Sequence, residues 1–138
     1  CDTFQFSGHT EQATAQSPFI GTMELTNLAN GSSHFVSVTT MLLGYTGPES
    51  AITSHEIKGR GTPGIDLVSF DEAQLLATQT PGVFALASRL QVKSGSGAYN
   101  CGEMITDLNT STVNFQTGLG VADYSGFGRL CRCNPSDN

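Results

Sequence analysis

Residues 94–133 read SGSGAYNCGEMITDLNTSTVNFQTGLGVADYSGFGRLCRC. The segment begins with a glycine-rich turn, alternates polar and apolar residues, and reaches a second turn at Gln116-Thr117-Gly118. Alternation on both sides of a short glycine-containing turn is typical of a β-hairpin. The segment also holds three of the four cysteines. It therefore predicts the fold class and the way in which the fold is cross-linked, but it indicates no reaction.

The register of this hairpin predicts which cysteines meet. A hairpin centred near Thr117-Gly118 pairs residues whose numbers sum to roughly 235 in an antiparallel ladder. Cys101 then lies opposite the region of Cys131 and Cys133. If the first strand of the fold is antiparallel to the last, Cys1 lies at the same corner. This register favours Cys101–Cys133 with Cys1–Cys131 over Cys101–Cys131 with Cys1–Cys133, and each bridge is expected to contribute about 2–4 kcal/mol.

The cysteines do not suggest a metal or catalytic site. Four cysteines that pair in an oxidising compartment leave no reactive thiol. Cys131-Arg132-Cys133 is a C-x-C element without a second pair at zinc spacing. The three histidines lack the H-x-H spacing of cupin-type metal sites. We therefore expect no metal and no cofactor.

The rest of the chain follows the two-residue period of β-strands. Asn30-Gly31 and Pro81-Gly82 mark turns, residues 59–64 (GRGTPG) are expected to be irregular, and residues 71–77 fit either a strand or a short helical turn. About eight strand-like segments with hairpin links predict an all-β, antiparallel, up-and-down barrel stapled by disulfides. Residues 1–133 are expected to form this one domain, and residues 134–138 a flexible tail.

Composition excludes several classes of partner. Charged residues make up 13% of the chain and the formal net charge is −6. Nucleic acids and anionic membrane surfaces are bound by clustered cations, and only Lys58 with Arg60 and Arg129 with Arg132 approach a cluster. No run approaches the roughly 18 apolar residues of a membrane span. We expect neither a nucleic-acid partner nor a membrane span.

The composition and the cysteines favour a secreted protein, either extracellular or periplasmic. A chain that begins at Cys1 and is rich in Ser, Thr and Gly fits a processed mature protein. Lipoprotein anchoring through Cys1 is the alternative, which the even cysteine count disfavours because lipidation leaves one thiol unpaired. The sequons at Asn30 and Asn109 are weak candidates for glycosylation and are compatible with secretion.

Four stretches carry a resemblance to a known group of proteins. They are GSGAYNCGE (95–103), VNFQTGLGVADYSGFGRLC (113–131), SHFVSVTTMLLG (33–44) and TPGVFALASRLQVKSGSGAY (80–99). They resemble the closing turn and strands of the allene oxide cyclase and dirigent-like (calycin-like) barrels. The resemblance implies a small secreted barrel that holds an apolar ligand in a productive shape. No catalytic motif of the cyclases is present at matched positions, so the resemblance assigns no catalytic residue.

His55, His34 and Arg89 are the candidate catalytic residues. Histidine titrates near neutral pH and is therefore a candidate acid or base. His55 shares strand parity with Ile57, and His34 with Val38, so both face the interior if those apolar residues do. Arg89 lies on the small-residue face of its strand, which is either solvent or the lumen. The alternatives are structural histidines and a solvated arginine.

The sequence supports two main hypotheses about function. The first is a secreted barrel that binds a small apolar or amphipathic molecule in its lumen, and that acts as a cyclase or isomerase if it templates the ligand's conformation. The second is a non-enzymatic extracellular binding or structural module with a filled barrel. A homo-oligomer is a further hypothesis. The first hypothesis requires an interior pocket of about 300 Å³, and without one it is lost to the second.

Overall fold

The computed structural model describes residues 1–15, 17–47, 50–58, 66–96 and 99–133, with side chains over 1–15, 17–40, 74–92 and 99–133. Within these ranges the chain forms nine β-strands and no helix. The strands are β1 (Asp2–Gln12), β2 (Phe19–Asn27), β3 (Ser33–Gly47), β4 (Ser50–Lys58), β5 (Asp66–Ala77), β6 (Val83–Ser96), β7 (Cys101–Thr106), β8 (Thr112–Asn114) and β9 (Val121–Cys131).

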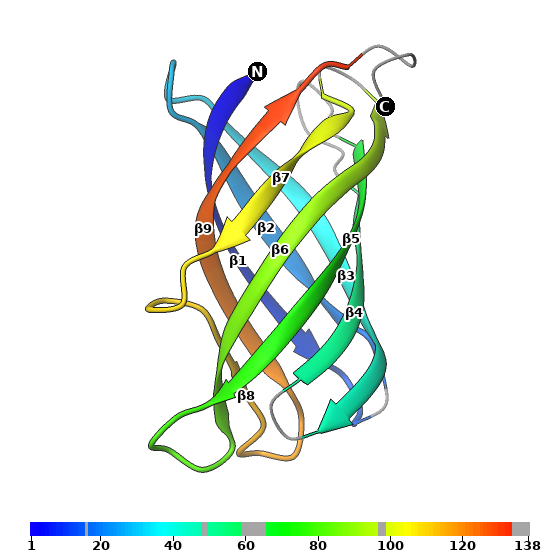
Figure 1. Cartoon of the computed structure of the whole chain (residues 1–138), viewed down its shortest axis with the longest axis vertical. Helices are drawn as coiled ribbons and strands as arrows, with labels where there is room; N and C mark the ends of the chain where they lie inside the picture. Colours follow the sequence, from blue (N-terminus) through cyan, green and yellow to red (C-terminus); the bar gives the residue numbers. More distant parts are fainter. Residues whose placement is uncertain (16, 48–49, 59–65, 97–98, 134–138) are drawn as a thin grey trace.

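All strands belong to one antiparallel sheet. Each strand from β1 to β6 pairs with the next in sequence, β6 pairs with both β7 and β8, and both of these pair with β9. β9 also pairs with β1, so the first and last strands lie side by side (Figure 1). The predicted all-β, antiparallel fold is confirmed. Residues 71–77 continue β5 as a strand and do not form a helical turn.

The turns fall where the sequence places them. Gly31, Gly82 and Gly118 have φ of 73°, 83° and 87°, a region in which a side chain is strained and glycine is not. Each lies between two strands: β2 and β3, β5 and β6, and β8 and β9. Residues 59–65 and the tail 134–138 lie outside the described residues, and the predictions made for them stand untested.

The predicted register of the final hairpin is right near its turn and wrong at its foot. Thr112 pairs with Asp123, as predicted. Thr106 pairs with Gly126 instead of the predicted Arg129. The first arm is not one strand, because residues 107–111 form a turn between β7 and β8. There Ser111 Oγ donates to Ser125 O (3.1 Å) and accepts from Ser125 N (3.1 Å), which replaces the interrupted ladder.

Two disulfides cross-link the foot of the hairpin and the start of the chain. They join Cys1 to Cys131 and Cys101 to Cys133, the pairing that the predicted register favours. The shifted register nevertheless places Cys101 directly opposite Cys131 in the ladder. Asn100 fixes Cys133 beside Cys101: its Nδ2 donates to Cys133 O (3.0 Å), and its Oδ1 accepts from Cys133 N (2.7 Å).

The side chains of the inner face form two apolar clusters. The first lies toward the end where the chain begins, and it comprises Phe4, Phe6, Met23, Leu25, Val36, Val38, Leu90, Val92, Met104 and Leu130. The second lies toward β8, and it comprises Phe19, Leu75, Leu86, Val113 and Ala122. Tyr124 packs against both. The clusters therefore meet around this one residue of β9.

Glycines on β1, on β9 and directly before β9 make room for the large inner side chains. A Cβ at Gly8 would overlap the ring of Tyr124, and one at Gly120 would overlap Phe19. A Cβ at Gly128 would lie 2.6 Å from Met104 Cγ. Large side chains thus lie over bare backbone, and this is how the inner face reaches close packing.

We predict that the two disulfides contribute unequally. Cys1–Cys131 spans 130 residues and Cys101–Cys133 spans 32. In the chain-entropy account these loops correspond to about 5 and about 4 kcal/mol. Urea denaturation of C1S/C131S should therefore give the lower free energy of unfolding, with C101S/C133S as its matched control. An equal or larger loss in C101S/C133S would contradict the assignment.

We also predict that Gly8→Ala destabilises the fold through Tyr124. The added methyl group displaces the ring, at a cost of about 1–3 kcal/mol. A double-mutant cycle with Tyr124→Ala tests the mechanism, because the cost of the methyl group should largely disappear once the ring is gone. Additive effects of the two substitutions, measured by chemical denaturation, would show that the two residues do not interact.

Candidate functional site

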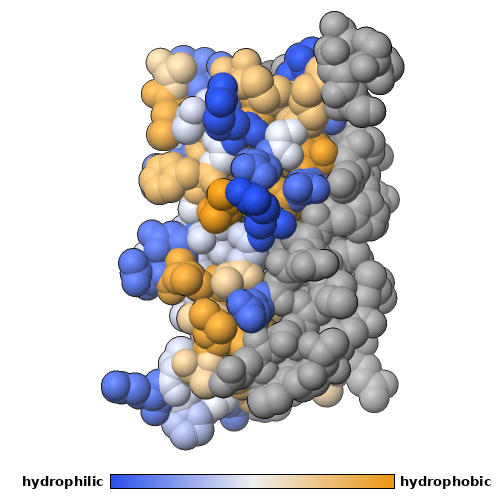
Figure 2. All heavy atoms as spheres, viewed as in Figure 1, coloured by the Kyte–Doolittle hydropathy of each residue, from blue (hydrophilic) through white to orange (hydrophobic). Residues whose placement is uncertain are grey.

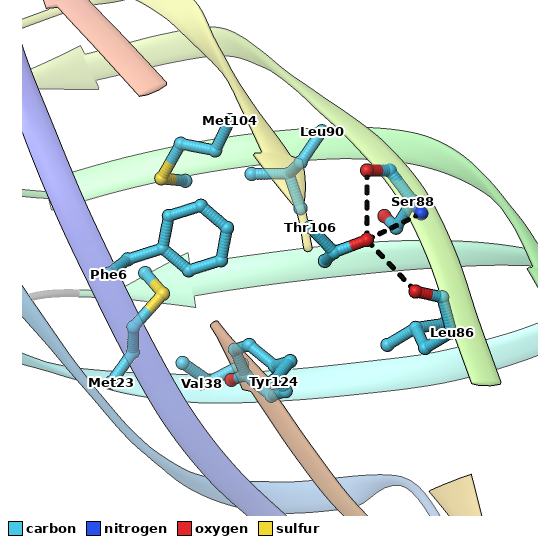
Figure 3. Close-up of a pocket in the computed structure, with 9 residues that line it drawn as sticks. All are labelled: Phe6, Met23, Val38, Leu86, Ser88, Leu90, Met104, Thr106 and Tyr124. Carbon is cyan, nitrogen blue, oxygen red and sulfur yellow. Dashed lines mark hydrogen bonds between the residues drawn. The ribbon is translucent and has the colours of Figure 1, made fainter. Parts of the chain in front are cut away.

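A small cavity lies where the two apolar clusters meet. It measures about 40 Å³, enough for a few water molecules. Its apolar wall comes from five strands and consists of Phe6, Met23, Val38, Leu86, Leu90 and Met104 (Figure 3). Ser88, Thr106 and Tyr124 supply its polar atoms. The described wall is thus apolar with a few hydroxyl groups, and it holds no charged side chain.

The hydroxyl of Thr106 is engaged by the backbone of β6. Its Oγ1 lies 3.0 Å from Leu86 O and 3.3 Å from Ser88 O, to which it donates, and it accepts from Ser88 N at 2.8 Å (Figure 3). Thr106 ends β7, so its side chain continues the pairing with β6 beyond the last backbone pair, Arg89 with Ile105. Its hydrogen-bonding role is therefore structural.

Tyr124 differs from Thr106 because its hydroxyl has no partner among the described residues. The oxygen is buried and makes no hydrogen bond to the part of the chain that the structure describes. The ring lies over Gly8, its partner on β1, and its centroid is 6.5 Å from that of Phe6. Burial raises the pKa of Tyr124 far above its usual 10, because an apolar environment disfavours the phenolate. The hydroxyl is thus a neutral, enclosed hydrogen-bond donor on a residue that lines the apolar cavity.

His34, a predicted site residue, lies on the inner face of β3 and is only 8% exposed. Its Nδ1 is buried and lacks a hydrogen-bond partner in the described part of the chain. Its ring centroid is 6.5 Å from that of Phe4. Phe4 also contacts Tyr99, whose hydroxyl donates to Asp2 Oδ2 at 2.7 Å. Burial, followed by this hydrogen bond to Asp2, raises the pKa of Tyr99 to about 12.

Of the predicted site residues, Arg89 and His34 lie on opposite faces of the sheet. Arg89 is exposed on the outer face, where its Nε lies 3.3 Å from Glu103 Oε2. His34 is on the inner face and is not part of the cavity wall. His55 pairs with Thr40 and Ser69 in the backbone register, and its side chain lies outside the described residues. The predicted parity of Arg89 with the small-residue face is correct, and that face is the solvent face.

A charged cluster that the sequence did not predict lies on the outer face. His9 Nε2 lies 2.8 Å from Glu11 Oε1, and His9 Nδ1 lies 2.6 Å from Asp123 Oδ1. The hydrogen bond to Asp123 is the larger cause of a raised His9 pKa, and that to Glu11 the second. Both nitrogens donate only in the imidazolium form. The H-x-E spacing was visible in the sequence, but Asp123 joins only through the β1–β9 pairing.

No group of three or more histidine, cysteine, aspartate or glutamate side chains within the described ranges is arranged to hold a metal ion. In the cluster around His9, the two carboxylates lie against opposite nitrogens of the ring. They therefore do not converge with the imidazole on a single point.

Among the described residues there is also no helix long and apolar enough to cross a membrane.

The two predicted sequons differ in their surroundings. Asn30 is exposed in the β2–β3 turn, where its Oδ1 accepts from the backbone nitrogen (2.9 Å) and the hydroxyl (2.7 Å) of Ser32. Asn109 is exposed in the turn between β7 and β8, but the hydroxyl residue of its sequon, Ser111, is fully buried. The asparagine side chains of both sequons lie at the surface.

The outer surface mixes polar and apolar side chains. Figure 2 shows hydrophobic residues interspersed with hydrophilic ones on the visible face. Ile105 and Phe127 pair across β7 and β9 and are 45% and 53% exposed. Single exposed apolar residues are usual on protein surfaces.

Comparisons of the chain with protein-family models, with curated proteins and with solved structures give no match.

We predict that His9 contributes to stability below neutral pH. Its pKa is raised above the ordinary 6.5, so the contribution is fully present below pH 6.5 and is lost as the pH rises through the raised pKa. Because the cluster is exposed, the effect should be under about 1 kcal/mol. NMR titration of the His9 ring should show the raised pKa, and Asp123→Asn should lower it more than Glu11→Gln does. A His9 pKa at or below 6.5 would contradict the prediction.

Proposed function

We propose that this chain is a secreted β-barrel protein that binds a small, mainly apolar molecule in its interior. The cyclic strand pairing, from β1 through β6 to β7 and β8, then to β9 and back to β1, supports the barrel. In a barrel of about eight strands the interior is just wide enough for side chains or for one small ligand. The two disulfides are compatible with an oxidising compartment.

The observation that carries the proposal is the Tyr124 hydroxyl. It is a buried donor without a partner among the described residues, and its residue is one of those that line an apolar cavity. Leaving such a group unsatisfied costs roughly 1–3 kcal/mol. A bound molecule that accepts the hydrogen bond removes this cost, and its apolar part gains from contact with the six apolar side chains of the wall.

The size of the cavity limits its occupant. About 40 Å³ within the described residues is far below the roughly 300 Å³ of typical ligand pockets. The cavity as it stands therefore does not meet the requirement of the sequence-based hypothesis, and a ligand must be very small or must enlarge it. Met23 and Met104 form part of the wall, and methionine side chains adapt readily because they are unbranched and have three rotatable bonds. The occupant is therefore a molecule of a few heavy atoms, or a larger one that displaces these two side chains.

Binding needs no catalytic group, and the proposal includes none. Tyr124 is the titratable side chain among the described wall residues, and burial holds it in its neutral form. Cyclisation or isomerisation would therefore proceed by conformational templating, without a proton transfer from the described wall.

A second candidate is a non-enzymatic extracellular module whose barrel is filled by its own side chains. The two apolar clusters and the small cavity favour it. In this alternative the outer surface carries the function, and the predicted homo-oligomer is one form that it could take. The two candidates differ in a measurable property, which is whether the interior accepts an apolar atom.

Xenon tests the choice between these candidates, because it enters apolar cavities without needing a polar contact. With the methionine methyl groups labelled, we expect the Met23 and Met104 signals to shift saturably with xenon pressure in NMR spectra. Val38→Leu, which adds one methylene group to the cavity wall, should weaken the response. Methyl signals that do not respond in the wild-type protein would exclude an accessible cavity and leave the filled module.

A further inference from the structure

We propose that the interior site selects an uncharged ligand with a hydrogen-bond acceptor, such as a ketone, aldehyde or ether, and that Tyr124 donates to that acceptor. The inference rests on the proposed function and adds the chemical class of the ligand. It comes from the distribution of polar atoms around the cavity.

The Tyr124 hydroxyl needs a hydrogen-bond acceptor, because it is an unsatisfied donor in the described structure. The oxygen is buried and has no partner within the described structure. A phenol has one O–H to donate, and burial keeps that proton in place at ordinary pH. A ligand that displaces neighbouring side chains and brings an acceptor oxygen to this enclosed hydroxyl completes the hydrogen bond, whereas a hydrocarbon of the same shape leaves it unmade.

The other polar groups of the wall do not offer an equivalent anchor in the described structure. Thr106 already donates to two carbonyls of β6 and accepts from Ser88 N. Ser88 also takes part in other interactions of its own. The rest of the described wall is apolar, so the part of the ligand away from Tyr124 meets hydrocarbon and thioether groups.

The ligand is uncharged because the described wall offers no countercharge. Arg89 and Glu103, which flank the cavity-lining residues Leu90 and Met104 in sequence, pair with each other on the outer face. A carboxylate or an ammonium group in the cavity would lose its hydration without an ion partner, which is strongly unfavourable. A neutral carbonyl loses far less, and it recovers that loss from Tyr124.

The packing of the ring does not explain the hydroxyl. The ring lies over Gly8 and contacts both apolar clusters, and phenylalanine would make the same contacts. Tyr99 provides the contrast, because its hydroxyl donates to Asp2 at 2.7 Å and so belongs to the fold. Tyr124→Phe and Tyr99→Phe are therefore matched variants. Each removes a tyrosine hydroxyl, which in the described structure lacks a hydrogen-bond partner at Tyr124 and has one at Tyr99.

The test measures binding of acetone, acetate and xenon by NMR in the wild-type protein and in both variants. We expect acetone to bind the wild-type protein, acetate to bind at least tenfold more weakly, and Tyr124→Phe to weaken acetone about tenfold, which is the value of one hydrogen bond. Xenon should bind wild type and Tyr124→Phe alike. Tyr124→Phe should leave the midpoint of urea denaturation unchanged or raised, whereas Tyr99→Phe should lower it without changing the preference for acetone.

The possible outcomes distinguish a failure of this inference from a failure of the proposed function. If xenon binds but Tyr124→Phe does not change the affinity for acetone, the interior is a binding site and the proposed ligand class is wrong. The same conclusion follows if acetate binds as tightly as acetone. If neither xenon nor acetone reaches the interior of the wild-type protein, the proposed function itself fails. A lower denaturation midpoint in Tyr124→Phe would show that the hydroxyl has a structural partner, and this would also overturn the inference.

Discussion

The pairing of β1 with β9 is the constraint on which the other features depend. It runs from Asp2 opposite Leu130 to Glu11 opposite Val121, and so joins the two ends of the described chain. Contacts between such distant residues carry a large loss of chain entropy on folding. The Cys1–Cys131 disulfide reduces that loss by restricting the unfolded chain. The same pairing places Asp123 beside His9 and Tyr124 over Gly8, so it also fixes the outer charged cluster and the wall of the cavity.

The sequence predicts what depends on local pattern. Thr112 pairs with Asp123 because a short turn sets the register of the strands next to it. Arg89 lies on the solvent face because the parity of a strand is a local property. The register at Thr106 is different because the turn at residues 107–111 interrupts the first arm. Residues 107–111 (Asp-Leu-Asn-Thr-Ser) continue the alternation of polar and apolar residues. Their pattern therefore does not distinguish this turn from a strand.

The candidate site depends on contacts between strands, which the residue pattern of a single strand does not predict. Tyr124 is next to Asp123 on β9. Whether its hydroxyl finds an acceptor among the described residues depends on how five other strands are arranged around it. His9 and Asp123 are far apart in sequence and meet only through the pairing of β1 with β9. His34 was identified because histidine titrates near neutral pH, yet it lies among aromatic side chains and outside the cavity wall. Residue type alone therefore does not predict which side chains line the cavity.

The interior combines two opposing features, and their magnitudes can be compared. Close packing of large side chains over glycines is what a filled core requires, and it leaves about 40 Å³. An unpaired buried hydroxyl costs roughly 1–3 kcal/mol, which is less than the about 4 kcal/mol of the smaller disulfide loop but large for a single atom. Phenylalanine would avoid this cost with the same packing. A core selected for stability alone therefore has no use for the Tyr124 hydroxyl, whereas a core that receives a hydrogen-bond acceptor recovers its cost on binding.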